Sequence, residues 1–278
     1  MRYLIKIAIL TLIFSINGEL PAKELRIISV TPSTTEIACA LGLIDNLSGV
    51  STFCDYPSEV KSKEKIGSFS EPNIEKIIFL KPDLVLATGL EQAETVLKLK
   101  KMDINVFTVD PKNFEELFAC IREIGEICGR RAQAAALIDR MKGSIARISE
   151  KVSLIKERDR PRVYLEIWHD PIMTVGKRSL VGEMITIAGG INITSDAPRP
   201  FSQFSPELII ERNPDVIILG YMNVGISATR AVSKRLGWQN INAVRYGRVY
   251  DDIDSNLLFR PGPRLILGAE ELYKRFYE

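Results

Sequence analysis

The chain has 278 residues, of which 46% are hydrophobic and 26% charged, and its formal net charge is +2. This is the composition of a soluble globular protein, long enough for two compact domains or one large one. The near-neutral charge gives no reason to propose nucleic acid as a partner, and no apolar run beyond the N-terminus reaches the length that crosses a bilayer.

The first residues differ from the rest of the chain. Arg2 and Lys6 flank the start of an apolar run, residues 7–14, which is followed by small and polar residues. A basic start, a short apolar segment and a small-residue exit are typical of a secretory signal peptide. We expect a signal peptide over residues 1–22 and an exported protein; the alternative is a buried N-terminal strand. No cysteine directly follows the apolar run, so we expect no lipid anchor there.

Residues 23–130 alternate between short apolar runs and helical patterns. We expect strands at 26–30, 83–87 and 105–109, and helices at 34–43, 91–101 and 114–128. Strands without polar alternation, separated by helices, indicate a parallel sheet that is covered on both faces. The segment therefore predicts an N-terminal α/β lobe.

Residues 131–157 contain no proline, one glycine and many good helix formers. A single helix of this length would span roughly 40 Å at 1.5 Å per residue, which is long for a core helix. It has to stop before Pro161, because the residue before a proline is pushed out of the helical conformation. We predict a linking helix over residues 131–158.

After Pro161 the alternation of strands and helices restarts. We expect strands at 162–166, 215–219 and 247–250, and helices at 179–188, 206–212 and 263–277. The predicted fold class is thus α/β, with one lobe over residues 23–130 and a second over residues 159–278.

The two halves share a pattern at a constant offset of 132 residues, the separation of Glu75 from Glu207. In each half a helix cap, this glutamate, two isoleucines and a Pro-Asp strand entry follow one another in the same order. Pro-Asp entries into strands are common, but five features in register argue against chance. We infer two homologous lobes with a ligand bound between them, where domain interfaces form clefts.

The chain lacks the constellations that catalysis needs. It has a single histidine, His169, and no G-x-S-x-G elbow, phosphate-binding loop or dinucleotide fingerprint. One histidine and no paired cysteine motif give poor support to a metal cage. We therefore predict a protein that is not an enzyme, without catalytic residues, a metal site or a cofactor.

The four cysteines are Cys39, Cys54, Cys120 and Cys128. Cys120 and Cys128 lie eight residues apart in a helical pattern, roughly 12 Å along the axis, which is beyond disulfide reach. Cys39 and Cys54 could pair in an oxidising compartment. Four free thiols are the simpler expectation, and the spacing is not that of a metal site.

Aromatic residues gather in predicted loops and at predicted strand ends. They are Phe53, Tyr56, Phe69, Trp168, Phe201 and Phe204. In open α/β sheets the binding crevice lies beyond the carboxyl ends of the strands. A single ring in such a place is more often part of the core. Together, in polar and turn-rich segments, the rings favour a cleft for a large flat ligand, because ring faces offer contact area at low entropic cost.

Several segments carry a resemblance to a known family. They are 26–33 with Glu36, 54–57 (Cys-Asp-Tyr-Pro), 72–75 (Pro-Asn-Ile-Glu), 80–85, Asp170-Pro171 with Thr174 and Gly176, 189–192, and 260–264 (Arg-Pro-Gly-Pro-Arg). From about residue 24 onward the chain resembles the periplasmic binding proteins for cobalamin, haem and ferric siderophores, and among them the cobalamin (vitamin B12) branch. The resemblance implies the class III fold of two Rossmann-like lobes with parallel-dominated sheets, joined by a single long backbone helix.

The resemblance also implies a docking role for Glu75 and Glu207. Binding proteins of this family carry one exposed acidic residue per lobe, which meets arginines of the permease dimer. The simpler explanation is that a glutamate in a first helical turn stabilises the helix dipole by a few tenths of a kcal/mol. Symmetric placement on both lobes favours docking.

The ligand contacts that the resemblance implies are Tyr56, Phe69, Trp168 and Phe201, with a polar loop of Asp254, Ser255 and Asn256. Leu257 replaces a tryptophan that some cobalamin binders have after this loop, so the corrinoid itself is left open. His169 could reach a metal in a bound haem or corrinoid, but a solvent-facing loop histidine is the simpler expectation.

The expected function is that of a monomeric periplasmic solute-binding protein, which holds a cobalamin-like corrinoid and delivers it to the permease dimer of an ABC importer. The first alternative is a haem or ferric-siderophore binder of the same fold. An alternative of another class is an exported enzyme or scaffold on this fold, which detectable turnover would reveal.

Overall fold

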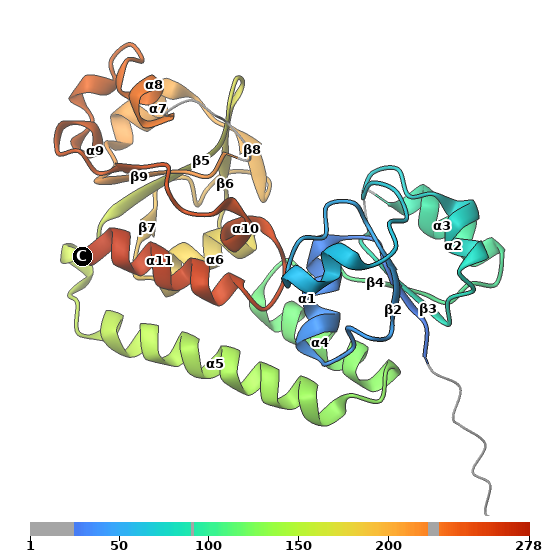
Figure 1. The fold of residues 1–278 in the computed structure, drawn as a ribbon. Helices are drawn as coiled ribbons and strands as arrows, with labels where there is room; N and C mark the ends of the chain where they lie inside the picture. The colour runs from blue at the N-terminus through green and yellow to red at the C-terminus, as the bar shows by residue number, and fades with distance from the viewer. Residues whose placement is uncertain (1–24, 90–91, 222–227) are drawn as a thin grey trace, which may run out of the picture.

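The computed structural model describes residues 25–89, 92–221 and 228–278, and it has two α/β lobes joined by one long helix (Figure 1). The predicted fold class is confirmed. The expected signal peptide, residues 1–22, lies outside the described residues. In the described ranges, no helix is both long and apolar enough to cross a membrane.

The N-terminal lobe is built on a four-stranded parallel sheet in the order β2-β1-β3-β4. Its elements are β1 (Ile27–Ser29), α1 (Pro32–Ala40), β2 (Leu47–Val50), a 3₁₀ turn (Ser58–Ser62), α2 (Ile74–Phe79), β3 (Leu84–Ala87), α3 (Ala93–Lys101), β4 (Val106–Thr108) and α4 (Phe114–Ile127). All strands and helices expected here are present, with boundaries shifted by a few residues. Strand β2 is missing from the expectations because Ser48 and Gly49 interrupt its apolar run.

Alternate residues of the central strands enter two separate cores. Ile27 and Leu84 pack with residues of α1 and α4, whereas Ile28 and Val85 pack with residues of α2 and α3. Because successive side chains of a strand point to opposite faces, a strand buried on both faces carries no polar alternation. This double coverage explains the continuous apolar runs in the sequence.

The linking helix α5 (Arg131–Ser153) runs along both lobes and contacts α4 at one end and α6 and α11 at the other (Figure 1). It is shorter than the expected segment of 131–158, because the chain leaves the helix after Ser153 and makes a separate 3₁₀ turn at Glu157–Asp159. The last helical side chain in the core is Val152, while Leu154 is 85% exposed. Beyond Val152 the helix has no apolar face left to bury.

The C-terminal lobe has a six-stranded mixed sheet in the order β10-β9-β5-β6-β8, with β7 also beside β5. Its elements are β5 (Arg162–His169), β6 (Ile172–Val175), α6 (Leu180–Ile187), β7 (Ile191–Asn192), β8 (Phe201–Gln203), α7 (Pro206–Arg212), β9 (Val216–Leu219), α8 (Ala228–Ser233), a 3₁₀ turn (Trp238–Asn240), α9 (Asn242–Arg245), β10 (Val249–Tyr250), α10 (Ser255–Phe259) and α11 (Leu265–Tyr277).

One part of this sheet departs from the expectations. Strands β6 and β8 are antiparallel, and β5 continues three residues beyond the expected end at 166. Trp168 therefore lies inside β5, opposite Met173, and does not follow the strand. A β-bulge between residues 166 and 168 lets the strand continue into a hairpin.

The sequence repeat has a structural counterpart in each lobe. Lys81 and Asn213, 132 residues apart, both have a left-handed backbone, with φ of 47° and 41°. The aspartates that follow, Asp83 and Asp215, each accept a hydrogen bond from the backbone N–H of an arginine at a neighbouring strand's start, at 3.0 and 2.9 Å. The Pro-Asp entry thus ties the α2–β3 and α7–β9 units to β1 and β5 in the same way.

Candidate functional site

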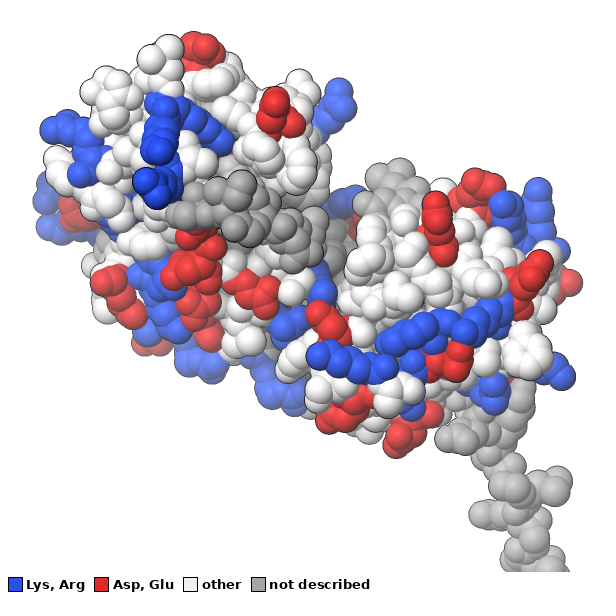
Figure 2. Space-filling model, turned by 45° about the horizontal axis from the view of Figure 1, so that its top comes forward, with Lys and Arg blue, Asp and Glu red and all other residues white. Residues whose placement is uncertain are grey.

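The surface is hollowed between the two lobes, as Figure 2 shows. On the C-terminal side two large rings are exposed, Trp168 at 45% and Phe201 at 48%. Trp168 pairs with residue 173 of β6 and Phe201 with residue 175. Because residues two apart on a strand share a face, both rings lie on one face of the sheet. Figure 1 places β8 on the side that faces the other lobe.

The N-terminal lobe presents three rings from its loops. Phe53 and Tyr56 follow the carboxyl end of β2 and are 53% and 46% exposed. The rings of Phe53 and Phe69 meet edge to face, with centroids 5.6 Å apart. The buried Gln92 side chain donates to the carbonyl of Phe69 at 2.6 Å and fixes that loop. Phe53 and Phe69 of this lobe therefore lie together.

The two lobes are joined by a network of ion pairs. Glu36 of α1, 3% exposed, accepts two hydrogen bonds from Arg264 and one from Arg260. Arg260 also donates to Asp55 at 2.6 Å, and this bond holds the pKa of Asp55 below its usual value. The Tyr56 ring stacks on the Arg264 guanidinium at 4.0 Å. A predicted ligand contact thus rests on the interlobe network.

This network was not predicted from the sequence, where Glu36 and the two arginines carry only the family resemblance. The sequence does contain an indication of a buried ion pair, because Glu36 is the one charged residue in a helix of small and apolar residues. A buried carboxylate needs a cationic partner, and the Arg-Pro-Gly-Pro-Arg segment at 260–264 supplies two.

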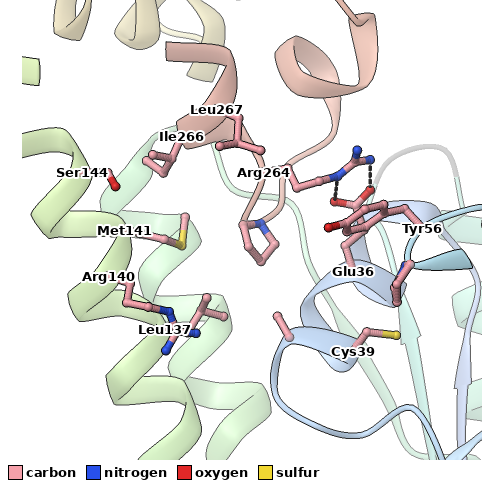
Figure 3. A pocket seen from close by; sticks show the side chains of 13 residues that line it. Glu36, Cys39, Tyr56, Leu137, Arg140, Met141, Ser144, Arg264, Ile266 and Leu267 are labelled. Atoms are coloured by element: carbon pink, nitrogen blue, oxygen red, sulfur yellow. Dashed lines mark hydrogen bonds and ion pairs between the residues drawn. The ribbon is translucent and has the colours of Figure 1, made fainter. Parts of the chain in front are cut away.

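A pocket of about 410 Å³ lies where α1, α5 and α11 meet. Figure 3 shows the Glu36–Arg264 pair and Tyr56 on one side of it, and Met141 and Arg140 of α5 on the other. Both lobes and the linking helix line this pocket, so its shape depends on the angle between the lobes.

The polar residues 254–256, which were expected in a loop, lie at the start of helix α10. Asp254 caps α10 by accepting a hydrogen bond from the Asn256 backbone N–H at 2.9 Å, and Ser255 and Asn256 are half-buried in its first turn. Asp254 also lies close enough to Arg264 to raise the pKa of that guanidinium, after the larger contribution of Glu36. The loop therefore borders the interlobe network.

His169 is exposed at the end of β5, with its ring 5.1 Å from that of Trp168 and 5.8 Å from that of Tyr221. Within the described ranges, no three His, Cys, Asp or Glu side chains come together as a metal site requires. All four cysteines are free thiols, and the Cys54 thiol lies 3.1 Å from the Thr35 hydroxyl.

A second buried carboxylate lies behind the C-terminal rings. Glu166 is fully buried and accepts two hydrogen bonds from Arg235, both at 2.7 Å, and one from each of Tyr164 and Tyr221. Burial first, then the nearby carboxylate, raises the pKa of both tyrosines, so they stay protonated donors. The cluster fixes the carboxyl end of β5, two residues before Trp168.

The two expected docking residues occupy equivalent places. Glu75 is the second residue of α2 and Glu207 the second residue of α7, and both are exposed. The side chains of Asn73 and Ser205 cap the two helices by accepting from backbone N–H groups at 2.8 and 3.4 Å. A hydrogen bond from Ser205 lowers the pKa of Glu207, which keeps this carboxylate ionised.

Known proteins share this sequence and architecture. The model of a family described as periplasmic binding protein matches residues 27–255. The uncharacterized ABC transporter substrate-binding lipoprotein YvrC of Bacillus subtilis (strain 168) is 41% identical over 257 residues, which cover 91% of this chain and 80% of that protein. A vitamin B12-binding protein of Photorhabdus laumondii is 29% identical over 269 residues, 96% of this chain and 94% of that protein.

Solved structures agree with these relatives. The periplasmic heme-binding protein RhuT from Roseiflexus sp. RS-1, in apo form, has a TM-score of 0.79 and 27% sequence identity, and the match covers 91% of this chain and 98% of that chain. One of these similar proteins is named for vitamin B12 and another for haem, so the names do not decide between the two ligands for this chain.

Proposed function

The chain belongs to the periplasmic binding protein family, which supplies solute-binding components to ABC importers, and on that premise we propose that it binds a corrinoid between its lobes and delivers it to a permease. The proposal includes export to the periplasm as a monomer that has no catalytic activity. The observation that carries it is the set of rings on both lobes: Trp168, Phe201, Phe53 and Tyr56 are exposed, and Phe69 is half-buried beside Phe53.

The rings suit a corrinoid because its macrocycle is large and flat. Ring faces bury a wide apolar surface while losing little conformational entropy, since an aromatic side chain has only two torsions to fix. Amides around a corrin edge would find polar partners in the loop that begins α10, where Ser255 and Asn256 are half-buried.

The charges near the hollow support a corrinoid over an anionic ferric siderophore. Arg260 and Arg264 are already paired with Glu36 and Asp55. An anionic ligand that took these arginines would leave the buried Glu36 without a partner, which is costly. A ligand whose outer groups are neutral amides leaves the network intact.

Haem is the second candidate, and His169 is the observation that favours it. Its ring is exposed at the end of β5, with its centroid 5.1 Å from that of Trp168. Tyr221 is a poor alternative ligand for iron, because its hydroxyl donates to the buried Glu166 and burial raises its pKa. Of these two side chains, His169 is therefore the better candidate ligand for iron.

The experiment measures binding by calorimetry and uses the two tryptophans of the chain as test and control. Protein purified without added ligand is titrated separately with cyanocobalamin, cobinamide, haemin and a ferric siderophore, and absorption spectra are recorded alongside. Saturable binding of a corrinoid, weakened by Trp168→Ala and not by Trp238→Phe, is the expected result, because Trp168 is 45% exposed and Trp238 is buried.

Other outcomes decide against the corrinoid. Saturable binding of haemin alone, with a Soret shift that His169→Ala abolishes, would support the haem alternative. Binding of the siderophore alone would support the ferric-siderophore alternative. Turnover of any of these compounds, retained through purification, would support an exported enzyme on this fold.

A further inference from the structure

The outer face of α2 exposes a large apolar surface next to its acidic residue. Phe79 is 81% exposed and Ile78 is 40% exposed, while Ile77 on the opposite face is fully buried. Residues three and four positions apart are neighbours on a helix surface, so Ile78 and Phe79 share the face of Glu75. The tip of the N-terminal lobe is therefore a carboxylate beside an unpacked aromatic ring.

The C-terminal lobe has a similar combination from a different part of the chain. The position equivalent to Phe79 at the repeat offset is Glu211, so the ring is not repeated in α7. Leu236, outside the repeated segment, is 95% exposed. It precedes Gly237, whose backbone packs so closely on α7 that an added Cβ would lie 2.9 Å from Cδ1 of Ile210.

Ile210 lies one helical turn beyond Glu207, so the backbone at residues 236–237 passes next to that part of α7. Leu208, also next to Glu207, is 38% exposed. Each lobe thus presents an exposed carboxylate together with a nearly fully exposed large apolar side chain. Single exposed apolar residues are ordinary on protein surfaces, but their pairing with the acidic residue on both lobes is not explained by the fold.

We infer that Phe79 and Leu236 are apolar anchors of the docking surface, and that the permease offers two equivalent sites, each an apolar pocket beside a cationic side chain. The inference rests on the proposed docking role of Glu75 and Glu207. Because the two lobes are related by the repeat, a partner that contacts both needs two equivalent sites. The acidic side chains on the lobes need basic side chains opposite them. The anchors would exclude water around each ion pair and so strengthen it.

The test measures binding of each variant to the importer's permease dimer, held in nanodiscs on a biosensor surface. Phe79→Ser should weaken the complex by about tenfold and Leu236→Ser by less, because a leucine buries a smaller area. Phe79→Leu should retain most of the affinity, since the pocket requires apolar surface. Leu154→Ser is the matched control, because Leu154 is 85% exposed at the end of α5 and should not affect binding.

The outcomes separate this inference from the proposed function. If Phe79→Ser and Leu236→Ser bind like wild type while a Glu75→Ala, Glu207→Ala double variant does not, the assignment of the two apolar anchors is wrong. The docking role of the two glutamates then stands. If the double variant also binds like wild type, the docking assignment fails and the anchors with it. If light scattering shows a dimer that Phe79→Ser dissociates, the apolar patch joins two copies of this chain and the inference is overturned.

Discussion

Glu36 and Arg264 are joined across the two lobes by two hydrogen bonds, from Nε to Oε2 at 3.0 Å and from Nη2 to Oε1 at 2.6 Å. Glu36 is almost fully buried, and the side chain of Arg264 is only 16% exposed. A contact of this kind holds the lobes at a fixed angle, because opening the cleft at this point would strip a buried carboxylate of its partners.

The first prediction concerns this pair. Glu36→Gln should lower the free energy of unfolding by about 3 kcal/mol, because Arg264 and Arg260 lose a buried counter-charge. Urea unfolding followed by circular dichroism measures the change. Asp55→Asn is the control, since Asp55 is half exposed and its bond to Arg260 should contribute less than about 1 kcal/mol. Equal losses in the two variants would show that Glu36 is not the principal interlobe contact.

The second prediction concerns the cleft rings. Trp168→Ala or Phe201→Ala should weaken ligand binding by about 1–3 kcal/mol, because each removes a large apolar contact from the bound ligand. The melting temperature should change little, since both rings are about half exposed. Trp238→Phe is the matched control: it should lower stability and leave affinity unchanged, because Trp238 is buried in the core. Unchanged affinity with a large loss of stability in Trp168→Ala would make that ring a core residue.

The third prediction follows from the thiols. Burial first, then the nearby Cys54, raises the pKa of Cys39 to about 12, and burial raises the pKa of Cys128 to about 11. Because the fold holds these protons more tightly than the unfolded chain does, the thiols stabilise the native state below the unfolded pKa of about 8.5, and this is lost as pH rises toward 11 to 12.

Alkylation by iodoacetamide at pH 8.5 measures this effect residue by residue. In the native protein both cysteines should react far more slowly than in urea, because the thiolate is the nucleophile. Mass spectrometry of the peptides gives both rates. Native Cys39 that reacts as fast as it does in urea at pH 8.5 would show that its thiol is not shielded.

Much of the fold could be predicted from the sequence because its strands are buried on both faces. Continuous apolar runs predicted β1, β3 and β9, and the offset of 132 residues predicted two equivalent lobes. The hairpin of β5 and β6 could not be predicted from apolar runs, because it depends on a bulge and on antiparallel pairing with a short strand. The end of α5 at Ser153 depends on where packing stops, which helix propensity does not show.

The site was predictable in its residue types and not in its contacts. Rings in loops and acidic residues in repeated helix starts can be found along the chain. The pairing of Glu36 with Arg264 joins residues 228 positions apart, and no local pattern links them. Likewise, Trp168 and Phe201 share a face only because of the register across β6.

The last prediction separates docking from ligand binding. A Glu75→Ala, Glu207→Ala double variant should keep its ligand affinity, because both carboxylates lie on the outer faces of α2 and α7. It should lose most uptake in vesicles that contain the permease, since each carboxylate would form a charge-assisted pair with an arginine. Reversal of both charges to lysine should be worse than alanine, and single changes should be milder because one anchor remains.

The matched control removes two exposed carboxylates elsewhere, by Glu123→Ala on α4 and Glu150→Ala on α5. The net charge changes equally, so a general electrostatic effect would lower uptake in both double variants and would be screened by salt in both. Docking predicts a loss in the Glu75 and Glu207 variant alone. Wild-type uptake by that variant, or loss of ligand binding in it, would contradict the docking role.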